Sequence, residues 1–131
     1  MTQEEKQLLL KDLCGRLLYR PKLQTYYKKI SGSGVFDDEL YEIDIDEQYC
    51  NDGRRLEDIK PYLHPLLSMT GKEREEFRKV GGIMSYNPQH DTWAISAFAP
   101  EAYDWLNKHG FDYRGLIPMG LALPATEGMY K

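Results

Sequence analysis

The sequence predicts an α+β fold: one compact domain with a mostly antiparallel sheet of hairpins, about three helices and an irregular apolar C-terminal tail. Helical periodicity appears near the start of the chain, near its middle and again later, and strand-length runs bounded by turn residues lie between. The chain has 131 residues, 41% of them hydrophobic, which is sufficient for one self-supporting core. We therefore expect a single domain over residues 1–131.

The first helix is expected from about residue 2 to about residue 16. Thr2 and Glu5 have the spacing of a capping box, in which each side chain bonds the backbone amide of the other residue. Apolar residues follow at helical spacing, namely Leu9, Leu10, Leu13, Leu17 and Leu18. Asp12 and Arg16 are expected on the opposite, polar side of this helix. Pro21 forbids further helix.

A hairpin is expected next, with strands over residues 22–30 and 35–46 joined by a turn at 31–34. The first run is rich in β-forming residues, and the turn segment, Ser-Gly-Ser-Gly, allows positive φ. The second run alternates, with Tyr41, Ile43 and Ile45 on one face. This pairing would bring Lys28 and Lys29 close to Asp37 and Asp38, so that opposite charges help to set the register.

Turn and proline signals divide the middle of the chain. Asn-Asp-Gly at residues 51–53 predicts a tight hairpin, and residues 54–59 fit either a short returning strand or a helical turn. Pro61 and Pro65 predict an irregular, partly extended connection over residues 60–68.

Two more helices and a third hairpin complete the prediction. A second capping box, Thr70 with Glu73, opens a charged surface helix that extends to about residue 80. Residues 83–86 and 92–98 form the hairpin, with Trp93, Ile95 and Ala97 expected on one face. Pro100 begins a helix over 101–109 that ends at Gly110. The tail, 111–130, is expected to make one or two helical turns within 112–121 and then to run extended.

The net charge of −4 is distributed unevenly along the chain. Residues 1–30 carry a balance of +4, and residues 31–60 carry a balance of −7. Proteins that bind duplex nucleic acid neutralise its phosphates with a basic surface. Here an acidic block directly follows the basic cluster, which consists of Arg16, Arg20, Lys22, Lys28 and Lys29. We expect the two blocks to neutralise each other, which argues against duplex nucleic acid as a partner.

The apolar runs and the cysteines indicate the compartment. The longest apolar runs contain three or four residues, too few for a membrane span or a signal-peptide core. We expect a cytoplasmic protein with no membrane partner. Cys14 and Cys50 belong to no Cys-x-x-Cys pair, so a structural zinc site has no support and both thiols are expected to be reduced. Cys14 is expected in the core, and Cys50, beside a turn, is expected to be partly exposed.

Motifs for catalysis or metal binding fail their spacing tests. Asp44-x-Asp46-x-Gln48 begins like a calcium loop, but the positions that need Gly and Glu hold Tyr49 and Arg55. The histidines are scattered, at positions 64, 90 and 109, without metal-ligand spacing. We therefore assign no catalytic residue, no metal and no cofactor. A small enzyme whose site is assembled from scattered polar residues stays open, the candidates being His64, His90, Asp91 and Cys50.

The chain contains ten tyrosines, many of them in or beside the predicted strands. Tyrosine suits both half-buried sheet faces and protein interfaces, so ordinary sheet packing and a tyrosine-lined binding surface are both open. Base stacking on single-stranded nucleic acid would also need interleaved basic residues, which Tyr26-Tyr27-Lys28-Lys29 offers. The candidate interaction surface consists of Tyr26, Tyr27, Lys28, Lys29, Tyr41, Glu42, Asp44 and Asp46.

Three stretches carry a resemblance to a known family. They are DIKPYLHPLLSMT at 58–70, DWLNKHGFDYRGLI at 104–117, and GLAL at 120–123 with EGMY at 127–130. The chain resembles a family of small uncharacterised proteins from Bacteroides-group gut bacteria and their phages, in which Arg is typical at the position of His64 and an acidic residue at that of Pro124. The resemblance implies a bacterial cytoplasmic context and a prophage or mobile-element origin, and it implies no activity or site residues.

The preferred interpretation is a small non-catalytic interaction module that binds a protein partner. The first alternative is a nucleic-acid-associated protein, either a weak single-strand binder or an acidic mimic that blocks another protein's basic groove. The small enzyme is the second alternative, and a homo-oligomer stays open.

Overall fold

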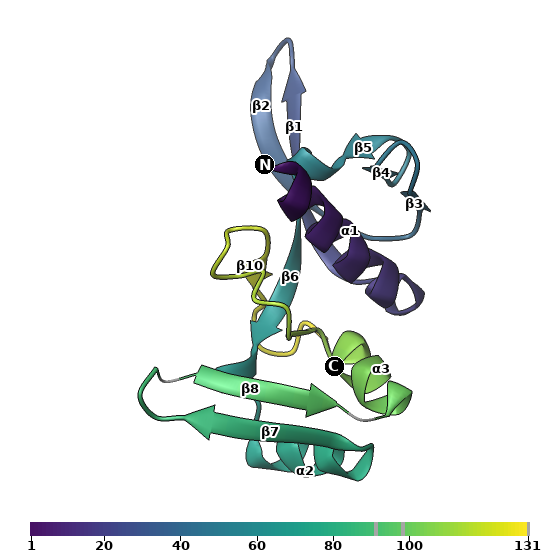
Figure 1. The fold of residues 1–131 in the computed structure, drawn as a ribbon. Helices are drawn as coiled ribbons and strands as arrows, with labels where there is room; N and C mark the ends of the chain where they lie inside the picture. The colour runs from purple at the N-terminus through teal and green to yellow at the C-terminus, as the bar shows by residue number, and fades with distance from the viewer. Residues whose placement is uncertain (91, 98, 131) are drawn as a thin grey trace.

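The computed structural model describes residues 1–90, 92–97 and 99–130, without the side chains of residues 29, 92, 93, 96 and 97. It confirms an α+β fold (Figure 1). The helices are α1 (Gln3–Arg16), α2 (Gly71–Lys79) and α3 (Pro100–Lys108), with 3-10 turns η1 (Leu17–Tyr19), η2 (Leu56–Asp58) and η3 (Leu66–Ser68). The strands are β1 (Lys22–Lys29), β2 (Gly32–Glu39), β3 (Ile43–Asp44), β4 (Tyr49–Cys50), β5 (Arg54–Arg55), β6 (Ile59–Pro65), β7 (Gly82–Asn87), β8 (Thr92–Ala97), β9 (Phe111–Asp112) and β10 (Leu123–Pro124).

The main sheet has five strands in the order β10-β6-β1-β2, with β9 also paired to β6. β1 is antiparallel to both β2 and β6, whereas β9 and β10 run parallel to β6. Two smaller antiparallel sheets, β3-β4-β5 and β7-β8, come before and after β6 along the chain. Figure 1 shows β6 running from the part that holds α1 and the β1–β2 hairpin to the part that holds α2, α3 and β7–β8.

The predicted helix starts are confirmed. Thr2 Oγ1 accepts from the Glu5 amide at 3.1 Å, and Thr70 Oγ1 accepts from the Glu73 amide at 3.1 Å, with the reciprocal bonds also formed. α3 begins at Pro100, whose missing amide donor is not needed in a first helical turn.

The first hairpin differs from its prediction. Its turn is Ile30–Ser31, so β2 begins at Gly32 and ends at Glu39 instead of running over 35–46. Gly34 is required by packing, because a Cβ there would lie 2.8 Å from the hydroxyl of Tyr27. The register pairs Lys22 with Glu39 and Lys28 with Ser33, so the expected closeness of Lys28 and Lys29 to Asp37 and Asp38 is wrong. Lys28 therefore lies at the turn end of the hairpin, and Asp37 and Asp38 lie toward its base.

The next two hairpins form as expected. Residues 51–53 all have positive φ and join β4 to β5, after which η2 follows, so residues 54–59 contain both the short strand and the helical turn. β7 and β8 pair in full, from Gly82 with Ala97 to Asn87 with Thr92. Ile95 packs on a core as expected, whereas the expectations for the side chains of Trp93 and Ala97 lie outside the described residues.

The predicted irregular connection over 60–68 is wrong, because Ile59–Pro65 is β6, the strand that joins the sheet together. The prolines are tolerated because they lie where ladders end. The β1 ladder ends at the pair of Pro61 with Leu23, and the β9 ladder ends at Pro65 with Asp112. The tail makes its turn over 116–120 and contributes β9 and β10, two parallel partners that its apolar, glycine-broken pattern does not reveal.

The predicted polar face of α1 is wrong, because two of its charged residues are buried in the structure. Asp12 and Arg16 are both 0% exposed, whereas Leu18, expected in the apolar stripe, is 84% exposed. The helix ends at Arg16, and the 3-10 turn that follows rotates Leu18 out of line with the stripe. The expected burial of the two cysteines is also wrong: Cys14, expected in the core, is exposed on α1, and Cys50, expected to be partly exposed, is buried.

Two hydrophobic cores lie on either side of the Asp12–Arg16 pair. The first gathers α1, β1, β6 and residues 116–122, and the second gathers α2, α3, β9 and Met69. Arg16 donates to both carboxylate oxygens of Asp12 at 2.9 and 3.1 Å, and its Nη2 donates to the Phe111 carbonyl at 2.6 Å. Arg114 Nη1 donates to Asp12 at 2.7 Å, and both guanidinium groups lie over the ring of Tyr113. This polar cluster connects α1 to the end of α3 and to β9.

We expect Arg16→Met to lower the free energy of unfolding by about 3–5 kcal/mol, because it leaves a buried carboxylate short of a partner and the Phe111 carbonyl without its donor. Urea unfolding followed by circular dichroism measures the loss. Lys11→Met, exposed on the same helix, is the control and should shift stability by no more than about 0.5 kcal/mol. Equal midpoints for the two variants would contradict this role of Arg16.

Candidate functional site

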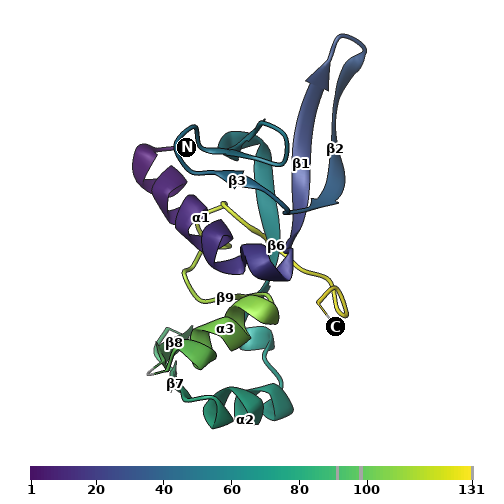
Figure 2. The same cartoon turned by 90° about the vertical axis from the view of Figure 1, so that its right-hand side faces the viewer.

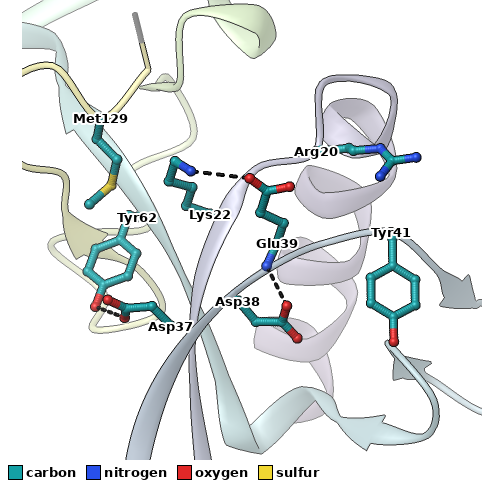
Figure 3. Close-up of a pocket in the computed structure, with 8 residues that line it drawn as sticks. All are labelled: Arg20, Lys22, Asp37, Asp38, Glu39, Tyr41, Tyr62 and Met129. Carbon is teal, nitrogen blue, oxygen red and sulfur yellow. Dashed lines mark hydrogen bonds and ion pairs between the residues drawn. The ribbon is translucent and has the colours of Figure 1, made fainter.

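A cleft of about 390 Å³ lies at the base of the β1–β2 hairpin, beside the C-terminal tail (Figure 3). Its walls come from β1, the acidic end of β2, β6 and the tail, so segments distant in sequence meet there. The lining residues are Arg20, Lys22, Asp37, Asp38, Glu39, Tyr41, Tyr62 and Met129. Three carboxylates, two cations and two phenols thus share one open hollow.

Tyr62 is the aromatic centre of this cleft. Its hydroxyl donates to Asp37 Oδ1 at 2.8 Å (Figure 3). The same hydroxyl accepts from Gln24 Nε2 at 3.3 Å. Partial burial raises the pKa of the Tyr62 phenol, and the hydrogen bond to the Asp37 carboxylate raises it further. Tyr62 therefore stays a neutral donor at physiological pH.

On the hairpin's other side, Asn51 connects the end of β2 to the β4–β5 turn. Its side-chain oxygen accepts from the Tyr41 amide at 2.9 Å, and its nitrogen donates to the Glu39 carbonyl at 2.7 Å. Tyr41 extends past this junction and donates to Asp52 at 2.7 Å, which is the main reason that its pKa is raised. The cleft wall is consequently held by hydrogen bonds from two separate sheets.

The chemistry of the cleft is suited to binding. Lys22 Nζ lies 3.2 Å from Glu39, whereas the guanidinium of Arg20 points away from the carboxylates (Figure 3). Asp38 accepts from the Glu39 amide and from Asn51 Nδ2, whereas Asp37 accepts from Tyr62 and keeps more acceptor capacity toward the hollow. A carboxylate that accepts one hydrogen bond keeps further lone pairs for a cation or an N–H donor. Among the described residues, no group of three or more His, Cys, Asp or Glu side chains is arranged to hold a metal ion.

The structure divides the candidate interaction surface between two places. Tyr26 and Lys28 are exposed on one face of the hairpin, which we term the outer face, but Tyr27 lies on the opposite face, against Phe36 at 5.9 Å between ring centroids. The side chain of Lys29 lies outside the described residues. The other four members follow β2 and are exposed around β3, namely Tyr41, Glu42, Asp44 and Asp46.

Sequence reasoning did not include two apolar residues of the hairpin. Val35 is 54% exposed and lies directly opposite Tyr26, which is 44% exposed, and Ile30 is fully exposed in the turn. Because opposite residues of an antiparallel pair share a face, Tyr26 and Val35 form one apolar spot on the outer face. The misplaced turn concealed Val35, because it put this residue at the start of the second strand and gave no register that pairs it with Tyr26.

The residues proposed for a small enzyme lie in different surroundings. His64 packs against Phe111 and Tyr130, with ring centroids 5.8 and 5.7 Å away, and Cys50 lies in the first core. Burial raises the pKa of the Cys50 thiol to about 12, which opposes a thiolate. His90 is exposed in the β7–β8 turn, and Asp91 lies outside the described residues.

Comparison with known proteins supplies no identity. No protein-family model, curated protein or solved structure matches this chain. Residues 58–70, 104–117 and 120–123 meet around β6, because they contain β6 itself, β9 and the first residue of β10. A separate observation concerns the helices: in the described part of the chain, none is long and apolar enough to cross a membrane.

The tail wall of the cleft depends on Tyr130. Its hydroxyl donates to the Tyr62 carbonyl at 2.5 Å and accepts from the Lys22 amide at 3.0 Å. Its ring lies on Gly110, where a Cβ would come within 2.6 Å. Burial raises the pKa of Tyr130 to about 12, so the neutral phenol keeps both bonds.

We expect Tyr130→Phe to lower the free energy of unfolding by about 1–3 kcal/mol, because two backbone groups lose their partner. Thermal or urea unfolding measures the change. Tyr26→Phe, which removes an exposed hydroxyl, serves as the control and should stay within about 0.5 kcal/mol of the wild type. A larger loss in the control than in Tyr130→Phe would refute the tail contact.

Stability should also depend on pH through His64. Burial lowers the pKa of His64 below its ordinary value of 6.5, and nearby Glu73 only partly opposes the shift. The unfolded chain therefore binds more protons than the folded chain below pH 6.5, so stability falls as the pH falls through that window.

We expect His64→Phe to reduce the difference in unfolding free energy between about pH 5 and about pH 7.5. His90→Gln, at an exposed turn, should leave the wild-type difference intact. His109, whose pKa burial also lowers, keeps some pH dependence in both variants. The measurement is urea unfolding at both pH values, and an unchanged difference in His64→Phe would count against this assignment.

Proposed function

We propose that the protein is a small non-catalytic interaction module that binds a protein partner through the outer face of the β1–β2 hairpin and the acidic cleft at its base. The resemblance to the Bacteroides-group family adds a proposed setting, a bacterial cytoplasm and a prophage or mobile-element origin. The observation that carries the proposal is the projecting hairpin with its exposed apolar spot.

The hairpin supports this function by its position and composition. Its far half extends beyond the rest of the chain in both views (Figures 1 and 2). Tyr26, Val35 and Ile30 are exposed on this projection, although their burial would favour folding. Exposed apolar groups that gather on one projecting element are typical of interaction sites, and tyrosine is enriched at protein interfaces.

The cleft favours a partner that presents a cationic side chain. Asp37 and Asp38 offer carboxylate acceptors beside the neutral phenols of Tyr41 and Tyr62. A lysine or arginine side chain fits such a site, since its charge meets carboxylates and its stem can lie along aromatic rings. The partner is therefore proposed to place an apolar group on Tyr26 and Val35 and a cationic group in the cleft.

A nucleic-acid-associated protein is the second candidate. Tyr26 and Lys28 lie on the same face of β1, an arrangement that can stack a base and bind a phosphate. The carboxylates of β2 oppose it, because they repel phosphates on the same face. Fluorescence anisotropy with a labelled single-stranded oligonucleotide at low salt separates the two candidates, and saturable binding would favour the second.

We expect Tyr26→Ala to reduce recovery of the partner by at least about fivefold when crosslinked complexes are purified from the native host. The reason is that replacing an interface tyrosine by alanine often costs about 1–2 kcal/mol of binding free energy or more. Tyr86→Ala is the matched control, since Tyr86 is also a strand residue and its 46% exposure is close to the 44% of Tyr26. The control should recover the partner as the wild type does.

Two results would overturn the proposal. One is equal recovery of the same partner by both variants, which would place the binding surface elsewhere. The other is the absence of any crosslinked partner together with turnover of a substrate by the purified protein, which would favour the small enzyme.

A further inference from the structure

The outer edge of β2 is an open strand edge. β2 is the last strand in the order β10-β6-β1-β2, and no strand pairs with its outer side within residues 1–90, 92–97 and 99–130. Figure 2 shows it as the outermost strand of the molecule. Alternate residues of an antiparallel edge strand point their N–H and C=O groups outward, so this edge offers a row of backbone donors and acceptors.

This edge has few of the features that protect strand edges from pairing. Proteins usually shorten such edges, place lysine or proline on them, or interrupt them with a bulge. β2 has eight residues, contains neither lysine nor proline, and pairs with β1 through eight consecutive positions without interruption. Its charges are confined to one end, Asp37, Asp38 and Glu39, and its other end is Gly-Ser-Gly.

The charges of the hairpin are complementary to those of a second, inverted copy. Lys28 lies near the turn, opposite Ser33, whereas the carboxylates lie at the base. Within one chain these groups are held apart by the register. An antiparallel copy placed along β2 brings the basic turn of each hairpin to the acidic base of the other.

One register satisfies both the apolar and the charged residues. With Val35 opposite Val35 of the second copy, the outer face carries the continuous row Tyr26, Val35, Val35, Tyr26 across the interface. The three acidic residues then face Ser33, Gly32 and Ser31 of the other chain, so no carboxylate opposes another. Lys28 of each chain reaches across Ser33 toward Asp37 of the other, over two strand spacings of about 5 Å each.

We infer that β2 pairs with β2 of a second copy of this chain, antiparallel and centred on Val35, to form a twofold-symmetric dimer with a continuous sheet. A twofold axis requires a self-complementary surface, and the distribution of apolar, basic and acidic groups on the hairpin meets that requirement. The inference uses the backbone edge of β2, whereas the proposed partner binds side chains of the outer face and the cleft, so Val35 and Asp37 take part in both. The dimer would place two such faces side by side.

Sedimentation equilibrium of the purified chain tests the dimer. At about 100 µM we expect the mass of two chains, falling toward that of one chain on dilution, since association follows mass action. Val35→Lys sets two like charges opposite each other at the axis and should weaken the dimer by at least about tenfold. Ile83→Lys, a strand residue of the other hairpin with 46% exposure, is the matched control and should sediment as the wild type does.

A cysteine at the axis tests the register. In a Cys14→Ser background, Val35→Cys should form a disulfide-linked dimer under mild oxidation, and Ser33→Cys should not, because Ser33 lies opposite Asp37 of the other chain. A wild-type chain that sediments as a monomer at all concentrations overturns the inference. The edge of β2 would then be open to pairing with a strand of a different protein. A dimer that resists Val35→Lys, or that crosslinks through Ser33→Cys instead, also overturns the inference. None of these three results decides whether Tyr26→Ala reduces recovery of the partner.

Discussion

The fold depends on one buried ion pair, Arg16 with Asp12, because this pair connects its two hydrophobic cores. Burying two charges is expensive unless every donor and acceptor is used, and here the guanidinium also bonds the last turn of α3 and the Phe111 carbonyl. Arg114 adds a second cation to the same carboxylate. A planar guanidinium can make these bonds together, which explains why an arginine occupies the position.

The cleft and the hairpin are positioned by that arrangement. Arg16 holds β9 through the Phe111 carbonyl, β9 pairs with β6, and β6 pairs with β1, the inner strand of the hairpin. Tyr130 then bonds β6 and β1 from the tail side and holds the tail, whose neighbouring residue Met129 lines the cleft. The hairpin can project with an exposed apolar spot because its base is fixed by contacts on both sides.

Local signals were sufficient for the helix starts and for the tight turn at 51–53, but they misplaced the turn of the first hairpin. Capping boxes at Thr2 and Thr70 and the Pro100 start each depend on a few neighbouring residues, and all three are confirmed. The errors came from non-local pairing. The prolines of β6 look irregular until their partners show that they lie at ladder ends, and Arg16 looks solvated until α3 approaches it. In the candidate interaction surface, the sequence pattern Tyr26-Tyr27-Lys28-Lys29 suggested one shared surface. The structure exposes Tyr26 and Lys28 on one face of the hairpin, but its register places Tyr27 on the other face.

The pairing of β6 with β9 has a topological consequence. The chain leaves β6 after Pro65 and returns at Phe111, and the two ends are adjacent, with the His64 amide bonded to the Gly110 carbonyl at 2.7 Å. The segment between them, which holds α2, β7, β8 and α3, is therefore an excursion that starts and finishes at one point of the sheet. Segments of different length or content could be exchanged there without moving the hairpin, provided that they restore a carbonyl for Arg16.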